Sequence, residues 1–229
     1  MKILALETST MLGGVAIADD GGLIAEVRLN VRTTHSERLM TAVDYALKQS
    51  DMALAGIDAV AVASGPGSFT GLRIGLSTAK GLCYAAGKPL VLVPTLEAFA
   101  WNFPYCAHPV CIMLDARKGE VYAAKFRWEH DRFATLVSAV SSRPEDFVKN
   151  CREPVVLAGE GVLRYRERIV LALGERAIIA PSHAMVPSPS NVALLGLQKA
   201  LRSEFADAAA AEPVYVRKSE AEVQWSERQ

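Results

Sequence analysis

Short apolar runs of strand length alternate with segments of helical periodicity along the first hundred residues. A hairpin signal, Asp-Asp-Gly-Gly at residues 19–22, separates two of these runs. The pattern predicts strands over residues 3–7, 13–18, 23–29, 57–63 and 90–93, and helices after residue 34, over 71–86 and over 94–102. Three linked strands followed by strand–helix units predict an α/β lobe with a mixed β-sheet and helices on its faces.

The helix after residue 34 begins with a capping box, in which Thr34 is the N-cap and Glu37 the third helical residue. Its apolar stripe consists of Leu39, Val43, Ala46 and Leu47. His35 lies in the first turn, where the helix dipole disfavours a cation. No nucleophile is near it in sequence, so we expect a neutral histidine that contacts a partner rather than a catalytic base.

The second half repeats this alternation more loosely. It predicts strands over residues 110–114, 120–127, 133–139, 155–158 and 177–180, and helices over 144–149, 163–173 and 191–205, the last capped by Ser190 or Asn191. Prolines interrupt the pattern near residues 102–108. We therefore predict a first lobe over residues 1–103 and a smaller second lobe over residues 104–229. Whether the last helix, about 191–205, packs back on the first lobe stays open.

A glycine-rich loop, residues 64–75, leads from a buried strand into the helix over 71–86. It lacks the lysine of a phosphate-binding loop, and Thr70 stands where a dinucleotide fingerprint needs glycine. Gly71, Gly75 and Ala79 form a stripe of small residues at intervals of four, which allows a close backbone approach. The spacing does not decide whether this stripe packs on the chain's own sheet or on the helix of another subunit. The opposite face carries Arg73, Ser77, Lys80 and Tyr84.

Composition excludes several classes of protein. Of 229 residues, 51% are hydrophobic and 22% charged, the net charge is zero and the pI is about 6.9, so there is no basic field for autonomous nucleic-acid binding. No run of 18 apolar residues predicts a membrane span, and the N-terminus is too briefly apolar for a signal peptide. The four cysteines form no Cys-x-x-Cys pair, which favours reduced, structural thiols in a cytoplasmic protein.

Candidate catalytic and metal-binding residues are few. Ser68 and Thr70 do not match a nucleophile elbow and are expected to cap a helix. Asp115 and Glu120 flank a predicted hairpin and could hold magnesium with a nucleotide, although a solvated turn fits them equally well. His108, His130 and His183 have no metal-binding spacing.

Taken together, these segments resemble the TsaB (YeaZ) family over almost the whole chain. The matching segments are residues 6–9, 34–37, 65–81, 95–98, 115–122 and 212–217. The resemblance implies two actin-like lobes of the ribonuclease H type. It also implies a non-catalytic subunit that acts with TsaD and TsaE. That assembly transfers a threonylcarbamoyl group from threonylcarbamoyl-AMP to N6 of adenosine 37 in tRNAs that read ANN codons.

The catalytic relative, TsaD, carries a metal-binding histidine pair, and the aligned positions here are Thr95 and Phe99. The phosphate hairpin of active relatives contains a glycine that residues 7–10 lack. The resemblance therefore implies no catalytic residue, no metal and no cofactor of its own, while ATP or ADP could bind in the complex with TsaD and TsaE. A remnant of a nucleotide site would consist of Glu7, Ser9, Asp115, Gly159 and Gly161.

The resemblance also implies that the helices beginning near residues 35 and 71 contact TsaD. The interface expected from it comprises His35, Leu39, Gly71, Arg73, Gly75, Ala79 and Lys80. tRNA would be bound only through the complex, no membrane is involved, and the same surface could support a homodimer. Two alternatives stay open: an independent actin-like ATPase or small-molecule kinase, and a glycoprotease-like hydrolase.

Overall fold

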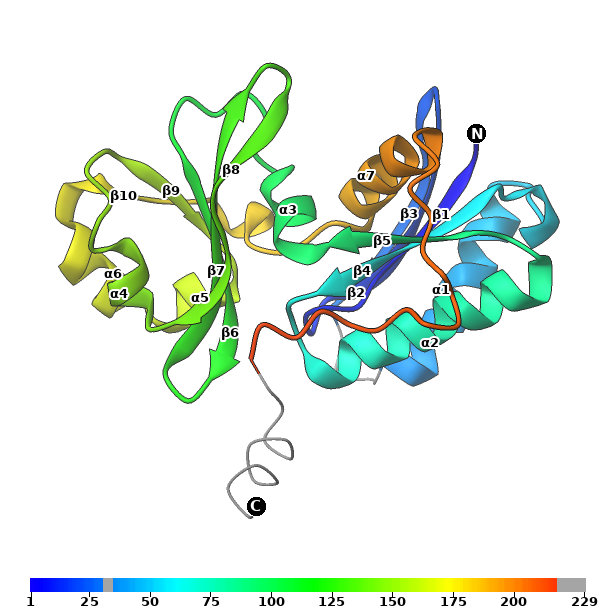
Figure 1. Cartoon of the computed structure of the whole chain (residues 1–229), viewed down its shortest axis with the longest axis horizontal. Helices are drawn as coiled ribbons and strands as arrows, with labels where there is room; N and C mark the ends of the chain where they lie inside the picture. Colours follow the sequence, from blue (N-terminus) through cyan, green and yellow to red (C-terminus); the bar gives the residue numbers. More distant parts are fainter. Residues whose placement is uncertain (31–34, 218–229) are drawn as a thin grey trace, which may run out of the picture.

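The computed structural model describes residues 1–30 and 35–217, which form two lobes side by side (Figure 1). The first sheet has the order β3-β2-β1-β4-β5 and the second the order β10-β9-β6-β7-β8. In each lobe the first three strands pair antiparallel, and the last two continue the sheet in parallel from the first. The second lobe therefore repeats the topology of the first.

The first sheet is covered by helices on both faces. Its strands are β1 (Ile3–Glu7), β2 (Gly13–Asp19), β3 (Gly22–Leu29), β4 (Ala59–Gly65) and β5 (Leu90–Pro94). Helices α1 (His35–Gln49) and α2 (Phe69–Ala86) pack their apolar stripes on one face, and α7 (Pro189–Leu201) packs on the other (Figure 1). Strands β1 and β4 are therefore buried on both sides, which explains their continuous apolar sequence.

The second lobe has its own core. Its strands are β6 (Val110–Arg117), β7 (Glu120–Glu129), β8 (Arg132–Ser142), β9 (Val155–Ala158) and β10 (Ala177–Ile179), and its helices are α4 (Pro144–Val148), α5 (Glu160–Arg164) and α6 (Arg166–Leu173). Helix α3 (Thr95–Ala100) leaves the first sheet and buries Leu96 and Phe99 in the core of the second lobe. Short 3-10 turns lie at Leu54–Gly56, Gly174–Arg176 and Ser182–Ala184.

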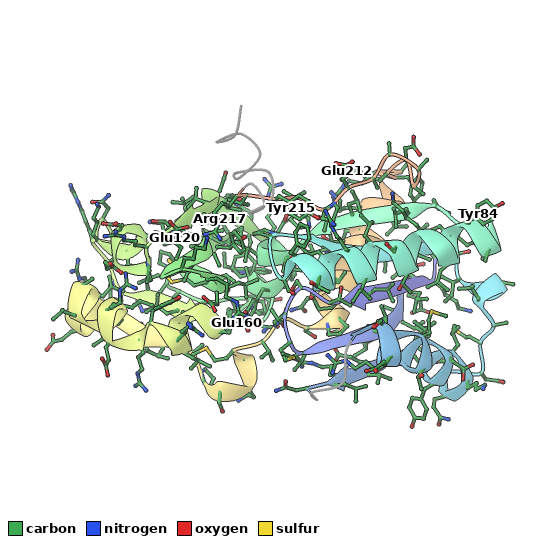
Figure 2. All side chains as sticks on the ribbon, turned by 90° about the horizontal axis from the view of Figure 1, so that it is seen from below. Tyr84, Glu120, Glu160, Glu212, Tyr215 and Arg217 are labelled. Atoms are coloured by element: carbon green, nitrogen blue, oxygen red, sulfur yellow. The ribbon has the colours of Figure 1, made fainter. Side chains whose placement is uncertain are left out.

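The segment 206–217 crosses the first lobe as an extended strap and ends on the second lobe. Its start bridges to the edge strand β5 at Leu90, and the Val214 amide donates to the Ser64 carbonyl over 2.7 Å. Figure 2 shows Tyr215 over the start of α2 and Arg217 beside Glu120. The Arg217 guanidinium lies 3.1 Å from the Glu120 carboxylate, so the strap joins the two lobes.

The structure corrects several predicted bounds. The helix predicted over 163–173 is two helices that meet at Tyr165. The last helix begins at Pro189 rather than after Ser190 or Asn191, because proline fits the first helical position without loss of a hydrogen bond. It ends at Leu201, short of the predicted residue 205. The predicted cap Thr34 lies outside the described residues. Among the described helices, none combines the length and the apolar character of a membrane span.

Candidate functional site

The glycine-rich loop seats helix α2 directly on the end of strand β1. Ser68 is the N-cap of α2, and its hydroxyl accepts a hydrogen bond from the Gly71 amide, as predicted for a cap. The Ser68 amide donates to the Ser9 carbonyl over 2.7 Å, and the Thr8 hydroxyl donates to the Gly71 carbonyl over 2.8 Å. Thr70, also predicted to be a cap, is the exposed second residue of the helix. The start of α2 is thus occupied by the chain's own residues 8 and 9.

The stripe of small residues on α2 faces the chain's own first lobe. A Cβ atom at Gly71 would overlap the Thr8 carbonyl oxygen, and one at Gly75 would overlap the Thr8 hydroxyl. Ala79 is fully buried in the core of the same lobe. The expectation that Gly71, Gly75 and Ala79 contact a partner is therefore wrong, and the alternative of packing on the chain's own sheet holds.

Glu7, at the end of β1, is completely buried. One carboxylate oxygen accepts a hydrogen bond of 2.6 Å from the Ser9 amide, while the other finds no partner among the described residues. Removal from water raises the pKa of Glu7 to about 7, although the hydrogen bonds from Ser9 favour its charged form. Glu7 is a poor contact for a phosphate, because it is buried and its ionised form would bring two negative charges together without solvent.

The corresponding turn of the second lobe is also closed. Gly159 and Gly161 bring the start of α5 so close to β6 that a Cβ atom at either position would overlap Met113. These glycines serve close packing within the lobe, so the structure does not support their assignment to a remnant adenosine loop.

The Asp115 carboxylate is held by neighbours from its own lobe. It accepts hydrogen bonds from the Arg117 amide over 3.0 Å and the Tyr165 hydroxyl over 3.1 Å, and pairs with the Arg164 guanidinium over 3.6 Å. Glu120 has a separate set of partners, since its carboxylate accepts from the Ser141 hydroxyl and from Arg217. The two carboxylates are each paired elsewhere, and the described residues contain no group of three or more His, Cys, Asp or Glu side chains that could hold a metal ion. These separate contacts give no support to Asp115 and Glu120 as a magnesium pair.

The two positions aligned with the TsaD histidine pair lie on α3, Thr95 as its first residue and Phe99 near its end. The Thr95 hydroxyl accepts a hydrogen bond of 3.0 Å from the Gly65 amide, which ties α3 to the glycine-rich loop. Phe99 is fully buried in the core of the second lobe. A hydroxyl that is already engaged and a buried phenyl ring have a structural role here, and neither offers the nitrogen ligand that the histidines provide.

The remaining predicted interface residues are largely occupied. Leu39 is buried under the first sheet. Arg73 donates to the Tyr215 hydroxyl over 3.0 Å and lies over the Phe69 ring, and Lys80 donates to the Ala209 carbonyl. The strap therefore covers the side of α2 that carries Arg73 and Lys80. The side chain of His35 lies outside the described residues.

The outward face of α1, and that of α2 beyond the strap, carry large apolar side chains. Tyr84 on α2 is 93% exposed, and Met40 and Tyr45 on α1 are half exposed. Figure 2 shows both helices on one side of the first lobe, with Tyr84 at the far end of α2. Sequence reasoning placed Tyr84 on the polar face of the helix, and it missed Met40 and Tyr45, which periodicity alone would have marked as outward-facing.

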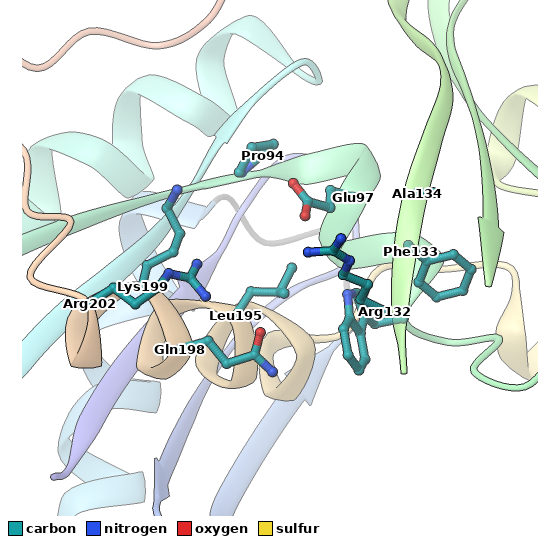
Figure 3. Close-up of a pocket in the computed structure, with 10 residues that line it drawn as sticks. Pro94, Glu97, Arg132, Phe133, Ala134, Leu195, Gln198, Lys199 and Arg202 are labelled. Carbon is teal, nitrogen blue, oxygen red and sulfur yellow. The ribbon is translucent and has the colours of Figure 1, made fainter. Parts of the chain in front are cut away.

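A pocket of about 530 Å³ opens between the lobes, away from the start of α2 (Figure 3). Glu97 of α3 and Arg132 of β8 point into it from opposite lobes. Burial chiefly raises the pKa of Glu97, while Lys199 and Arg202 oppose this shift. Both cations are also paired with Glu204. The pocket thus combines the Glu97 carboxylate with cations, whereas a phosphate site would be lined by cations and hydrogen-bond donors.

Comparison with known proteins identifies the family to which this chain belongs. A family model described as TsaD, tRNA N6-adenosine threonylcarbamoyltransferase, matches residues 17–225. The tRNA threonylcarbamoyladenosine biosynthesis protein TsaB of Bacillus subtilis is 33% identical over 232 residues, which cover the whole of both chains. The chain belongs to the TsaB family.

Solved structures agree with this assignment to the TsaB family. A crystal structure from Pseudomonas aeruginosa, described as an uncharacterized protein with similarity to peptidase YeaZ, superimposes with a TM-score of 0.83 at 28% identity. The match covers 94% of this chain and 99% of that one. The ethanolamine utilization protein EutJ from Carboxydothermus hydrogenoformans, at 13% identity and a TM-score of 0.53 over 86% of this chain and 90% of its own, shares the fold alone. The actin-like fold with two lobes is thereby confirmed.

Proposed function

We propose that this TsaB-family chain is a non-catalytic subunit of the assembly that forms threonylcarbamoyladenosine in tRNA, and that it activates a TsaD partner together with TsaE. The observation that carries this proposal is the use of Thr95 and Phe99 at the positions of the TsaD histidine pair, one engaged with Gly65 and the other buried. The start of α2, an anion site in principle, is filled by residues 8 and 9.

These features weigh against the alternatives. An independent ATPase or kinase needs a phosphate hairpin open to its ligand, whereas Gly71 is packed against Thr8 and Glu7 is a buried acid. A hydrolase needs an activated nucleophile, whereas the Ser68 hydroxyl caps α2. We infer that any ATP or ADP binds in the complex rather than to this chain alone, and that the complex acts in the cytoplasm.

We expect reconstitution to separate these functions. The isolated chain should leave tRNA unmodified, while addition of TsaD, TsaE, ATP and threonylcarbamoyl-AMP should yield threonylcarbamoyladenosine, measured by mass spectrometry of digested tRNA. The same mixture without this chain is the control and should lose most of the product. Modification of tRNA by this chain alone, or nucleotide turnover in the absence of the partners, would contradict the proposal.

The partner surface is proposed to be the outward faces of α1 and α2. Exposed tyrosine and methionine side chains are the residue types that dominate protein interfaces, and Met40, Tyr45 and Tyr84 lie there. The chain's zero net charge implies weak tRNA binding outside the complex. Self-association through the same faces would compete with the partner.

Replacement of both Met40 and Tyr84 by Asp is expected to weaken binding to TsaD at least about tenfold. The complex would then bury two unpaired charges in place of two apolar side chains. The melting temperature should change little, since Tyr84 is almost fully exposed and Met40 is half exposed before any partner binds. Calorimetry with TsaD measures the effect. Leu171→Asp is the matched control, because Leu171 is 89% exposed on the second lobe and should not alter binding. Equal binding by the double variant would refute this surface.

A further inference from the structure

Two of the four cysteines lie together in the core of the second lobe. Cys111 on β6 pairs in register with Lys125 on β7, and the Lys125 ammonium lies 4.0 Å from the sulfur of Cys151. Cys111 and Cys151 belong to the same buried cluster, and the interaction between their thiols raises the pKa of Cys111 and lowers the pKa of Cys151. The described residues offer no third ligand for a metal at this pair.

The surroundings favour a thiolate at Cys151 and a thiol at Cys111. The hydrogen bond from Cys111, followed by the charges of Lys125 and Arg176, lowers the pKa of Cys151, against the effects of burial and of Glu153. Arg176 also donates to the Cys151 carbonyl, which fixes this cation beside the residue. Hydrogen bonding to Cys151 and burial raise the pKa of Cys111.

Cys151 is buried but belongs to a segment whose other residues are exposed. Its own exposure is 5%, but Asn150, Arg152, Glu153 and Pro154 around it are all exposed. Cys151 is thus the inward-facing residue of an exposed segment between α4 and β9. A small, uncharged oxidant can reach the sulfur through a local opening of this segment.

We propose that Cys151 is a peroxide-reactive thiol site and that Cys111 is its resolving partner. The Cys151 thiolate attacks one oxygen of hydrogen peroxide, the O–O bond breaks, and the departing hydroxide takes a proton to leave as water. Cys151 is oxidised to sulfenic acid by two electrons as the peroxide is reduced. The Cys111 sulfur then attacks the sulfenic sulfur, and the S–O bond breaks. The leaving hydroxide takes the Cys111 proton, which gives a disulfide and a second water.

The experiment treats the whole chain with a small molar excess of hydrogen peroxide, blocks remaining thiols by alkylation, and maps peptides without reduction. The expected product is a Cys111–Cys151 linked peptide with the mass loss of two hydrogen atoms. Cys111→Ser should stop at a sulfenic acid on Cys151 that dimedone traps, and Cys151→Ser should abolish both products. Cys83→Ser and Cys106→Ser are controls that should leave the disulfide unchanged.

The cysteine variants could fail to fold, so a further variant keeps all four cysteines and changes only a neighbouring charge. Lys125→Met should slow the oxidation at least about threefold, because the neighbouring ammonium no longer stabilises the thiolate. Oxidation of Cys106 ahead of Cys151, a disulfide that involves Cys83, or an unchanged rate in Lys125→Met would each overturn the proposal. None of these results depends on the proposed role in tRNA modification, since the readout is the thiol chemistry of the isolated chain.

Discussion

Replacement of Gly71 by Ala is expected to destabilise the folded chain by about 1–3 kcal/mol. The added methyl group would overlap the carbonyl oxygen of Thr8, which is backbone and cannot rotate away. Helix α2 would have to move off β1, and this would strain the hydrogen bond from the Thr8 hydroxyl to the Gly71 carbonyl. Alanine is the better helix former by roughly 1 kcal/mol, but the overlap with the Thr8 backbone outweighs this gain.

The same helix provides a matched control. Gly81 is exposed on α2, and a Cβ atom there would meet nothing within 4 Å. Gly81→Ala should therefore stabilise the chain by up to about 1 kcal/mol, through helix propensity alone. Urea unfolding of both variants measures the difference. A stabilised Gly71→Ala variant, or a Gly75→Leu variant that melts as the parent does and fails only in partner binding, would restore the interface interpretation of the stripe.

Glu7→Gln is expected to remove a pH dependence of stability that the parent chain has. The raised pKa means that folded Glu7 keeps a proton that the unfolded chain releases. Its contribution to the free energy of unfolding is therefore fully present below the ordinary pKa of 4.5 and is lost as the pH rises to about 7. Across that window the parent should lose stability on the order of 3 kcal/mol relative to Glu7→Gln. Above pH 7.5 the difference should be constant, with the variant the more stable protein.

Denaturant unfolding at several pH values between about 3 and 8 tests this expectation. Glu145→Gln is a control of opposite sign, because the hydrogen bond from Arg168 lowers the pKa of Glu145. That carboxylate contributes stability above its ordinary pKa, which is lost on acidification. A stability difference between Glu7→Gln and the parent that does not vary with pH would mean that Glu7 titrates alike in the folded and unfolded chains.

Much of the fold could be predicted from the sequence, because apolar periodicity reports burial. The five strands of the first lobe and the helices between them follow this pattern closely. The strap could not be predicted in the same way, since an extended segment held by single contacts such as Tyr215 to Arg73 has no periodic signal. The break between α5 and α6 at Tyr165 could not be predicted either, because two short helices in succession have the same apolar periodicity as one longer helix.

The candidate site was harder to predict than the fold. Spacing marks Gly71 and Gly75 as a close contact but does not say which backbone approaches, and only the position of Thr8 decides it. Asp115 and Glu120 were grouped because they flank one hairpin, yet Arg164 of α5 pairs with the first and Arg217 of the strap with the second. The resemblance to a family identified Thr95 and Phe99, whereas the sequence alone could not show that both side chains have structural partners.

The position of α7 has a consequence for synthesis of the chain. One face of the first sheet is covered by Val192, Ala193, Leu195, Leu197 and Ala200, which pack on strands formed by residues 3–93. During translation that face has no cover until the ribosome has also produced the entire second lobe. We therefore expect the nascent first lobe to present an apolar sheet to chaperones while residues 95–188 are made. A fragment that stops before residue 189 is expected to aggregate even though it contains every strand of its sheet.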